Sequence, residues 1–541
     1  MKNAVSLALW AATIGGAVAS VPASAHAFCG FYVGGAETDL YNDATMVVLM
    51  REGTRTVLSM QNSYRGPPEG FAMVVPVPVV LQEENVRTLS DEVFARVDRL
   101  AAPRLVEYWE QDPCMVRRPR RRARQATRSS EIVDAFGGSA RRDRELGVTV
   151  EAEFEVGEYD IVILGAEDSS GLDTWLREEG YRIPRGAEPA LRPYVQSGTK
   201  FFVARVDPSR VTFRDGRAML SPLRVHYDSD TFSLPVRLGL INSPGAQDLV
   251  VHVLGRNQRY EVANYPNVFI PTNFEVRGRA RRRFGPFYAA LFDKTLEVNP
   301  GAVVTEYAWQ AGSCDPCPGP TLTPRDIMTL GGDVVSGGGD RARRVGRNVA
   351  SQYTLTRLHY RYRPGGLDED LVFREAPAVA GGRGTPNRRG RFDREIRRAS
   401  VNNFQGRYAI LHRWRGAIEC ANPRRGRWGG PPNRQAPRPQ AARDLATQPR
   451  RGVRLRSFVH RPIPELQRPR RRGGGGEGAE PLAPTAYKSD FGTPRPDAEE
   501  PAPTAAAAAL AGCRASPGRG ALGGLGLAAA ALALRLRRRR R

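Results

Sequence analysis

The chain has 541 residues, of which 41% are hydrophobic, and its 81 lysines and arginines against 57 aspartates and glutamates give a formal net charge of +24. Residues 28 to about 420 hold most of the β-branched and aromatic residues, enough to bury a substantial core in one large domain or two lobes. The arginine clusters lie outside this apolar body and lack the interleaved aromatic residues that stack on single-stranded bases, so we expect no nucleic-acid partner.

The first 27 residues have the features of a secretory signal peptide in the required order. Lys2 supplies the positive charge, residues 4–18 are apolar, and Ala25-His26-Ala27 is an Ala-x-Ala cleavage site. We therefore expect the export machinery to release a mature chain that begins at Phe28 after cleavage behind Ala27. The alternative interpretation is an N-terminal helix buried in the body.

Strands dominate the sequence pattern of the body, residues 28–420. Two β-rich runs joined by a glycine-containing turn at 51–54 predict a hairpin, and Pro76 and Pro78 place the end of the next strand at a sheet edge. Predicted strands cover residues 44–50, 55–60, 71–80, 148–154, 159–164, 200–206, 223–227, 236–241, 248–254, 302–309, 353–363 and 408–414. Predicted helices cover residues 84–100, 172–179 and 285–298, with Ser90 as an alternative N-cap of the first.

The predicted helices fall between groups of strands rather than after each strand. This order favours an α+β fold over a doubly wound parallel sheet. A basic segment at about 117–147 interrupts the body and is expected to be a mobile loop. We interpret the arginine clusters as solvated segments. Whether they also contact anionic lipid or polysaccharide is not decided by the sequence.

After residue 420 the composition changes to proline, glycine, alanine and arginine, which predicts a disordered stalk over residues 421–510. The tail, residues 511–541, places Cys513 before an apolar run at 521–534 and a final arginine cluster. About 14 helical residues span roughly 21 Å, less than the ~30 Å of a bilayer core. The tail is therefore interpreted as a sorting and processing signal that meets the membrane, more than as a permanent transmembrane anchor.

Six cysteines occur in the chain, and export would permit disulfides between them. Cys513 belongs to the tail, so an odd number stays in the body and at least one thiol has no partner there. We prefer the pairs Cys29 with Cys114 and Cys314 with Cys317, which would leave Cys420 unpaired. The spacing by itself leaves the connectivity open.

Cys314-Asp315-Pro316-Cys317 has the spacing of redox-active dithiols. Such a dithiol normally precedes a helix, whereas Pro318-Gly319-Pro320 follows here and prevents a helix from continuing out of the motif. The next helix is predicted to begin at Pro324 with Thr323 as its N-cap. We therefore favour a structural disulfide over a catalytic dithiol, and a zinc site lacks the second cysteine pair that it needs.

Other chemistry has little support in the sequence. Five histidines of the mature chain are scattered singly, without an HExxH motif, and neither a nucleophile elbow nor a Walker A loop occurs. We expect no cofactor and no catalytic residue among them. Glu151, Glu153 and Glu155 alternate along a strand, which is typical of a solvated face, with a weak cation site as the alternative.

Several separate motifs carry a family resemblance: RGPPEGF at 65–71 leading into VVPVP, YDIVILGAEDSSGLDTWLREEGY at 159–181, YPNVFIPTN at 265–273 and EYAWQAGSCDPC at 306–317. Together they resemble the DUF2330 family of exported bacterial proteins of unknown function, over most of residues 28–370. The tail resembles the MYXO-CTERM sorting signal, in which a cysteine at the position of Cys513 precedes a short apolar helix and arginines. That resemblance implies a sorting protease as a partner and display at the cell surface.

The sequence thus predicts an exported protein attached to the envelope, outer membrane or cell surface, with a non-enzymatic binding or structural body and an unidentified ligand. The alternative is an envelope thiol–disulfide oxidoreductase that uses Cys314 and Cys317. A hydrolase whose residues meet only in the fold is a third possibility that one sequence leaves open.

Overall fold

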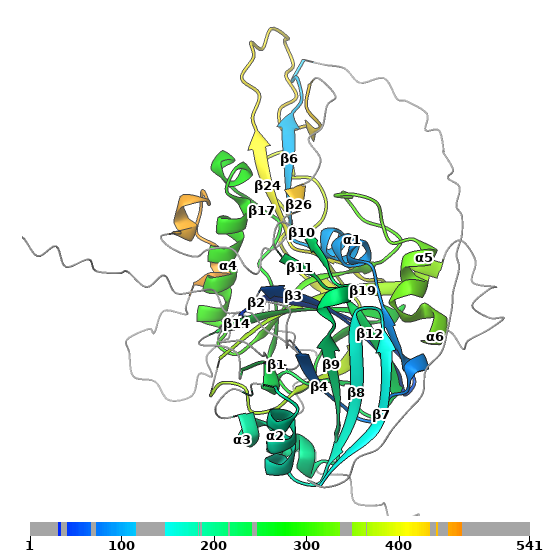
Figure 1. The fold of residues 1–541 in the computed structure, drawn as a ribbon. Coiled ribbons are helices and arrows are strands. Elements are labelled where there is room, and N and C mark those ends of the chain that lie inside the picture. Colours follow the sequence, from blue (N-terminus) through cyan, green and yellow to red (C-terminus); the bar gives the residue numbers. More distant parts are fainter. Residues whose placement is uncertain are drawn as a thin grey trace, which may run out of the picture. The chain divides into compact units, whose positions relative to one another are not determined.

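The computed structural model of the chain describes residues 31–33, 41–65, 72–114, 147–181, 183, 187–214, 217–240, 246–335, 349–363, 365–432, 440–441 and 453–467 (Figure 1). These residues belong to one unit of the chain, Met1–Thr493. Strands predominate over a few helices among them, so the fold is α+β, as the sequence pattern predicted. The segment at 117–146 and the tail at 511–541 lie outside the described residues.

The largest sheet among the described residues has the strand order β22-β21-β23-β18-β19-β14-β2-β3-β12-β5, and β16 pairs with β18. At its centre β14 runs parallel to β2 and antiparallel to β19, so the sheet is mixed. Its strands are β2 (Tyr41–Glu52), β3 (Arg55–Arg65), β5 (Val86–Thr88), β12 (Leu223–Asp228), β14 (Gln247–Arg256), β16 (Asn267–Phe269), β18 (Val303–Gln310), β19 (Tyr353–Tyr362), β21 (Val379–Gly381), β22 (Arg397–Arg398) and β23 (Asn403–Gln405).

Both faces of this central sheet are buried. On β2, Val47 and Leu49 join the core shared with a second sheet, whereas Val48 and Met50 join a core formed with helices on the opposite face. A strand covered on both sides reads as a continuous apolar run, which explains the uninterrupted sequence MVVLM at 46–50. Burying apolar surface on both sides is the main stabilising contribution to this layer.

The second sheet has the order β1-β4-β9-β8-β7 and covers one face of the central sheet. Its strands are β1 (Phe31–Val33), β4 (Ala72–Val77), β7 (Val148–Val156), β8 (Tyr159–Ala166) and β9 (Lys200–Val206). In the described residues β1 pairs with Ala72–Val74 alone, so the end of β4 that contains Pro76 is bonded on one side, to β9. That arrangement spares Pro76 a hydrogen bond that it cannot donate.

Smaller sheets extend the body. One consists of β13 (Ser233–Leu234), β20 (Leu371–Ala376) and β15 (Arg259–Val262), and β10 (Thr212–Arg214) pairs with β11 (Arg217–Met219). Another consists of β17 (Phe274–Glu275), β24 (Arg407–His412), β6 (Arg104–Glu110), β25 (Trp428–Gly429) and β26 (Gln440–Ala441). In Figure 1, β6 and β24 run side by side away from the other labelled strands, with a loop beyond them.

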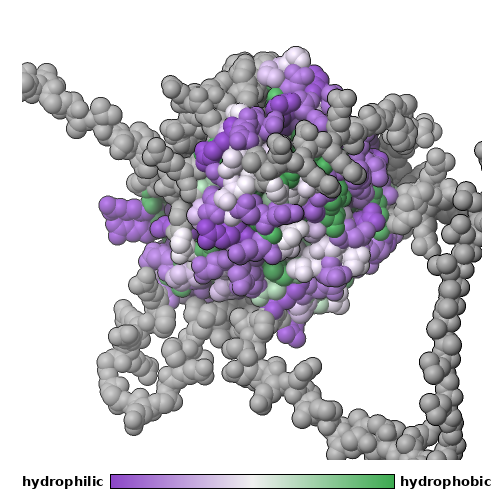
Figure 2. Space-filling view, turned by 60° about the horizontal axis from the view of Figure 1, so that its bottom comes forward, coloured by the Kyte–Doolittle hydropathy of each residue, from purple (hydrophilic) through white to green (hydrophobic). Residues whose placement is uncertain are grey.

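The helices pack on the sheets through apolar stripes. They are α1 (Asp91–Ala101), α2 (Ser169–Glu178), α3 (Ala187–Gln196), α4 (Phe284–Val298), α5 (Pro324–Ile327) and α6 (Asp333–Val335), with a π-turn at Met328–Gly332. Short 3₁₀ turns lie at Glu83–Asn85, Pro208–Arg210, Arg237–Leu240, Gly278–Arg281, Val349–Gln352, Leu455–Ser457 and Pro464–Leu466. Helices α1, α5 and α6 cover one end of the central sheet, α4 covers β18, and α2 and α3 cover the second sheet. Figure 2 shows that hydrophilic side chains dominate the face it presents, with small hydrophobic areas between them.

Most predicted elements are present within a few residues of their expected bounds, and three predictions were wrong or incomplete. Helix α1 begins at Asp91 rather than at 84, because Val86–Thr88 pairs with β12 and Ser90 caps the helix. The strand predicted at 236–241 is a 3₁₀ turn, because the carboxylate of Asp370 accepts hydrogen bonds from the N–H groups of residues 236 and 237. Helix α3 was not predicted.

The folded body also extends into the segment predicted to be a stalk. Strands β25 and β26, at 428–429 and 440–441, pair with β6, although both follow residue 420. Phe458, Val459, Ile463 and Leu466 are buried in the core beside α4. These four residues form an apolar stripe that is hard to recognise in the sequence, because the segment is rich in proline and arginine. The packed body therefore continues to about residue 467.

The loop after β21 offers a test of packing. Gly382 and Gly384 both have positive φ, +66° and +84°, but a Cβ at Gly382 would overlap the backbone oxygen of Gln405, whereas nothing lies within 4 Å of one at Gly384. We predict that Gly384→Ala lowers the free energy of unfolding by about 1 kcal/mol, the cost of a left-handed alanine. Gly382→Ala is expected to lower it by about 3 kcal/mol, because overpacking is added. Denaturant titration measures both, and equal losses would contradict the packing argument.

Candidate functional site

A network of buried charges lies between the central sheet and α4. Its centre is Glu306 on β18, whose carboxylate accepts hydrogen bonds from Arg357 Nε at 2.6 Å and from the hydroxyl of Tyr288. Nδ1 of His359 lies 2.7 Å from the same carboxylate. The second guanidinium branch of Arg357 reaches Asp98 on α1 at 2.5 Å. The network therefore joins the central sheet to two helices.

The network continues toward the surface along β19 and β14. Nε2 of His359 lies 3.2 Å from Asp248, and Arg361 donates from Nε to the same carboxylate at 2.7 Å. Arg361 also pairs with Asp293 on α4 at 2.5 Å, at the edge of a pocket of about 540 Å³. The ring of Phe292 stacks on His359 with centroids 3.7 Å apart. Arg361 and Asp293 are thus the members of the network that line the pocket.

The local environment decides the charge states. Burial would raise the pKa of Glu306, but the positive charges and hydrogen bonds of His359 and Arg357 bring it down to about 2. Burial would likewise lower the pKa of His359, and the carboxylates of Glu306 and Asp248 reverse that effect and raise its pKa above the ordinary value. Burial and the charge of Arg357 hold the pKa of His252 well below its usual value. His252 is therefore neutral, which fits its position 3.2 Å from Arg357 Nη1, where Nε2 can accept.

The geometry favours a structural role for the inner part of this network. The side chains of Glu306, Arg357 and His359 are at most 2% exposed, and Phe292 covers the imidazole. A solute from solvent does not reach them without rearrangement of α4. What the network does is hold opposite charges in place across three elements, and truncating one member of such a group leaves its partners buried and unpaired.

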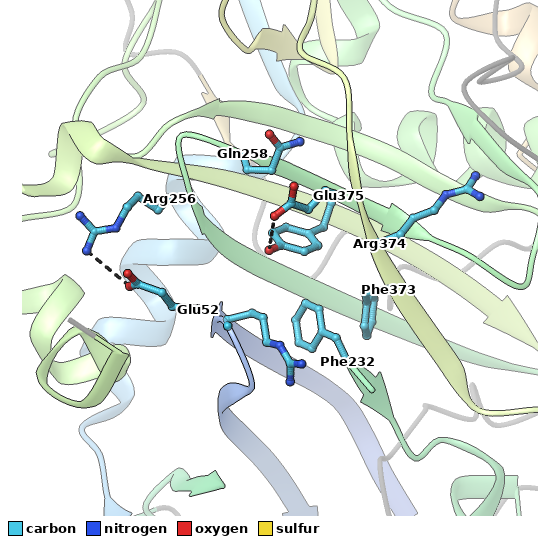
Figure 3. A pocket seen from close by; sticks show the side chains of 10 residues that line it. Glu52, Phe232, Arg256, Gln258, Phe373, Arg374 and Glu375 are labelled. Atoms are coloured by element: carbon cyan, nitrogen blue, oxygen red, sulfur yellow. Dashed lines mark hydrogen bonds and ion pairs between the residues drawn. The ribbon is translucent and has the colours of Figure 1, made fainter. Parts of the chain in front are cut away.

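A second pocket, of about 350 Å³, lies where the β2–β3 turn, the β14–β15 turn and β20 meet (Figure 3). Phe232 forms its apolar wall with two other rings, at centroid distances of 5.3 Å from Tyr260 and 5.1 Å from Phe373. The guanidinium of Arg51 lies 5.5 Å from the Phe232 centroid. Arg51 donates to the carbonyl oxygens of residues 54 and 230 and to the hydroxyl of Thr56, and none of its hydrogen bonds within the described residues goes to a carboxylate.

Polar groups complete the rim of this second pocket. Glu52 pairs with Arg256, as Figure 3 shows, and the two side chains are 3.4 Å apart. The Tyr260 hydroxyl lies 3.5 Å from the carboxylate of Glu375. Burial and the neighbouring Glu375 raise the pKa of Tyr260 to about 12, so its hydroxyl keeps its proton at neutral pH. The pocket therefore combines aromatic walls with fixed donors, the composition of a small-molecule binding site.

The structure joins Cys314 and Cys317 in a disulfide within a loop without helical structure. Buried side chains hold the loop from below: Gln405 Nε2 donates to the carbonyl oxygen of residue 315 at 2.5 Å, and Arg104 donates to that of residue 316 at 2.7 Å. Helix α5 begins at Pro324 and Thr323 caps it, as predicted. Cys317 is exposed and Cys314 is half-buried.

Cys114 forms a disulfide with Cys420, 306 residues away, which corrects the preferred pairing of Cys114 with Cys29 and the prediction of an unpaired Cys420. Strands β6 and β24 run parallel and bring the residues that follow them to the same end of their sheet, a proximity that sequence spacing does not reveal. Ala27, Cys29 and Cys513 lie outside the described residues.

The carboxylates predicted on one strand face occupy β7. Glu151 pairs with Lys200 at 2.9 Å and Glu155 with Arg210 at 2.9 Å, whereas Glu153 is exposed. Across the part of the chain that the structure describes, no group of three or more histidine, cysteine, aspartate or glutamate side chains is placed to hold a metal ion. Searching the same residues for a helix with the length and hydrophobicity to cross a membrane gives none.

The charge network was not predicted, because each histidine was considered singly. The available signal was the alternation of Arg357, His359 and Arg361 in a strand whose other residues are tyrosine, leucine and threonine. Three charged side chains on one face of a buried strand require partners, and Glu306 and Asp248 lie in the neighbouring apolar strands. The second pocket gave no such signal, because its residues come from four separate segments.

Comparison with known proteins gives one match. A family model named DUF2330, described as an uncharacterized protein conserved in bacteria, matches residues 22–374. Neither the curated proteins nor the solved structures contain a match to the chain. The matched range includes β14, β18 and β19 with the whole charge network, and it ends before β24.

We predict that Glu306→Gln lowers the free energy of unfolding at neutral pH by about 3–5 kcal/mol, because Arg357 and His359 stay buried while each loses one of its two carboxylate partners, the other being Asp98 or Asp248. The folded pKa of Glu306, about 2, lies below its ordinary value of 4.5. Its stabilising contribution is therefore complete above pH 4.5 and is lost as the pH falls from there through the folded pKa. Glutamine does not titrate, so the variant should lack this part of the acid destabilisation.

Denaturant titrations between neutral and acidic pH measure this effect. Glu153→Gln removes an exposed carboxylate from β7 and is the matched control, with an expected change within about 0.5 kcal/mol. If Glu306→Gln were as stable as Glu153→Gln, the network would not hold the layers together.

Proposed function

The chain belongs to the bacterial family DUF2330, and on that premise we propose that it is an exported domain of the cell envelope that acts by binding or structural support rather than by catalysis. The family's description carries no activity, so the proposal depends on this chain's own contacts. It includes attachment to the membrane through the tail and display at the outer membrane or cell surface.

The observation that carries the proposal is the disulfide between Cys114 and Cys420. Together with Cys314–Cys317 it pairs every cysteine among the described residues. Disulfides persist in oxidising compartments and are rare in the cytosol. A cross-link that closes a loop of about 300 residues also stabilises the fold by restricting the unfolded chain. Both facts support a location of the body on the extracytoplasmic side of the membrane.

The ends of the sequence support the same location. Residues 1–27 have the order of a signal peptide, with Ala27 at the cleavage site, and the tail has the order of a MYXO-CTERM-like signal with its cysteine at Cys513. We propose that the export machinery cleaves behind Ala27 and that a sorting protease acts near Cys513.

The two pockets support a binding role. Each is bordered by arginine and tyrosine side chains. In one pocket Arg361 pairs with Asp293, and in the other the Tyr260 hydroxyl donates to Glu375. The pocket of Figure 3 pairs aromatic walls with a guanidinium, that of Arg51, which is free of carboxylate partners within the described residues. These features suit a small organic anion with an apolar part.

We predict that protein taken from the native envelope has an intact mass corresponding to residues from Phe28 to near Cys513, with Cys114 and Cys420 resistant to thiol-trapping reagents. Envelope fractionation with intact-mass spectrometry measures both. Folded protein confined to the cytoplasm, with Cys114 and Cys420 as free thiols, would overturn the proposal.

One observation favours the alternative, an envelope thiol–disulfide oxidoreductase: Cys317 is an exposed residue. Opposing it, α5 begins seven residues after Cys317, so the motif does not lie at the N-terminus of the helix that follows it, where a thiolate would be stabilised. The clamped carbonyl groups of residues 315 and 316 also hold the loop in its oxidised form.

We predict that the wild-type protein does not reduce a test disulfide with a dithiol such as dithiothreitol as electron donor, beyond the rate of the dithiol by itself. Cys114→Ser is the matched control for Cys314→Ser, because each removes one disulfide from the same chain. An activity in the wild type and in Cys114→Ser that disappears in Cys314→Ser would establish the oxidoreductase and reject the structural disulfide.

A further inference from the structure

The end of the sheet formed by β6 and β24 carries a concentration of positive charge. We call residues 413–428, the loop between β24 and β25, the basic arm. It contains arginines at positions 413, 415, 424, 425 and 427 against one acidic residue, Glu419. From 415 to 425 every residue is exposed except Cys420, which is half-buried. Figure 1 shows this loop beyond the ends of β6 and β24.

The basic arm is held in a defined shape. Its main support is Glu110 on β6, whose carboxylate accepts hydrogen bonds from Arg425 Nε at 2.7 Å and from the backbone N–H groups of residues 414 and 426. The hydrogen bonds of Arg425, with those backbone groups, lower the pKa of Glu110 to about 2. The disulfide from Cys114 to Cys420 ties the middle of the loop to the segment that follows β6. The arm is therefore preorganised.

A neighbouring turn enlarges the positive surface. Residues 387–391 form a tight turn in which the side chain of Asn387 accepts hydrogen bonds from the N–H groups of Arg389 and Arg391. Trp428 Nε1 donates to the carbonyl oxygen of Asn387 at 3.0 Å, which joins the turn to the base of the arm. Arg388, Arg389 and Arg391 are all exposed. Two separate segments thus present arginines on one side of this sheet.

The tip of the arm is apolar. Ile418 is 41% exposed, and it is one of three large apolar side chains that are exposed among the described residues. Exposed alanines stand on both sides of it, at 417 and 421, and Arg415 and Arg424 flank them. Neither of these two arginines has an ion pair with another described residue, so their guanidinium groups are free to bind a partner.

We propose that the basic arm is a docking surface for anionic phospholipid, in which the arginines bind headgroup phosphates and Ile418 enters the boundary between headgroups and acyl chains. Arginine pairs with phosphate through two parallel hydrogen bonds, and each basic residue near an anionic bilayer adds favourable electrostatic energy. An apolar side chain between cations is the pattern of interfacial segments. The body would then touch a membrane at a place distinct from the C-terminal tail.

An acidic polysaccharide is the competing partner, and the structure favours lipid over it. Sugar rings stack on exposed aromatic faces, but the ring of Trp109 is stacked on His412 and that of Trp428 is covered by Arg413. An exposed isoleucine at the tip has no role in binding a hydrated polymer. This inference rests on the proposed function only in that an exported protein would meet an envelope membrane in the cell. Purified protein is sufficient to test it.

The test is hydrogen–deuterium exchange of the full exported chain with vesicles of phosphatidylglycerol and phosphatidylcholine, compared with vesicles of phosphatidylcholine alone. Exchange is read peptide by peptide, so binding by the tail does not obscure the arm. We expect peptides covering 413–428 to gain protection with the anionic vesicles only. The double variant Arg415→Gln/Arg424→Gln should weaken this protection, requiring roughly 25-fold more lipid, at about fivefold for each arginine. Ile418→Ser should weaken it severalfold.

The matched control is Arg325→Gln/Arg363→Gln, which removes the same charge from two exposed arginines on α5 and after β19 and should leave the protection unchanged. Unchanged exchange of β14 peptides verifies that each variant is folded. Three results would overturn the inference: no protection of the arm, equal protection by neutral vesicles, or protection by soluble alginate but not by vesicles. The last would assign the arm to polysaccharide. If the protein were not exported in cells, the proposed function would be wrong, but the vesicle experiment would still decide whether the arm binds lipid.

Discussion

The need to keep a buried carboxylate paired organises the centre of this protein. Glu306 lies inside the structure, and it is stable there as an anion because Arg357, His359 and Tyr288 surround it. These partners come from the neighbouring strand and from α4, and Arg357 in turn binds Asp98 on α1. The relative positions of the central sheet, α4 and α1 therefore depend on one set of charges whose separation would be energetically expensive.

The apolar core supplies most of the stabilising free energy. The charge network fixes how the strands of the central sheet and α4 are aligned with one another. The central sheet is covered by the second sheet on one face and by helices on the other, with neighbouring residues of β2 entering different cores. Apolar contacts of this kind tolerate small shifts, whereas the hydrogen-bonded pairs of Arg361 with Asp248 and Asp293 require one alignment of β19, β14 and α4. Conformational specificity is the role that we assign to the network.

Features suited to interaction lie at the periphery instead. The pocket of Figure 3 and the pocket beside Arg361 occur where turns and strand ends meet, and the basic arm extends the sheet of β6 and β24. The arm depends on Glu110 and on the disulfide from Cys114 to Cys420, and residues after 374 contribute most of it. The match to the family covers residues 22–374, so the loop that forms the arm is an extension beyond the matched range. The matched range and the proposed docking surface thus occupy largely different parts of the chain.

The sequence by itself determined the α+β class, most strands, the caps at Ser90 and Thr323, and the family, because hydrophobic periodicity and capping residues act over a few neighbouring positions. Tertiary structure decided the partner of Cys114, since parallel pairing of β6 with β24 brings together residues about 300 positions apart. It also decided that residues up to 467 belong to the body and that the charges of β14, β18 and β19 form one network. Such contacts arise from the packing of distant segments, and no local pattern encodes which segment a buried charge or an apolar stripe will meet.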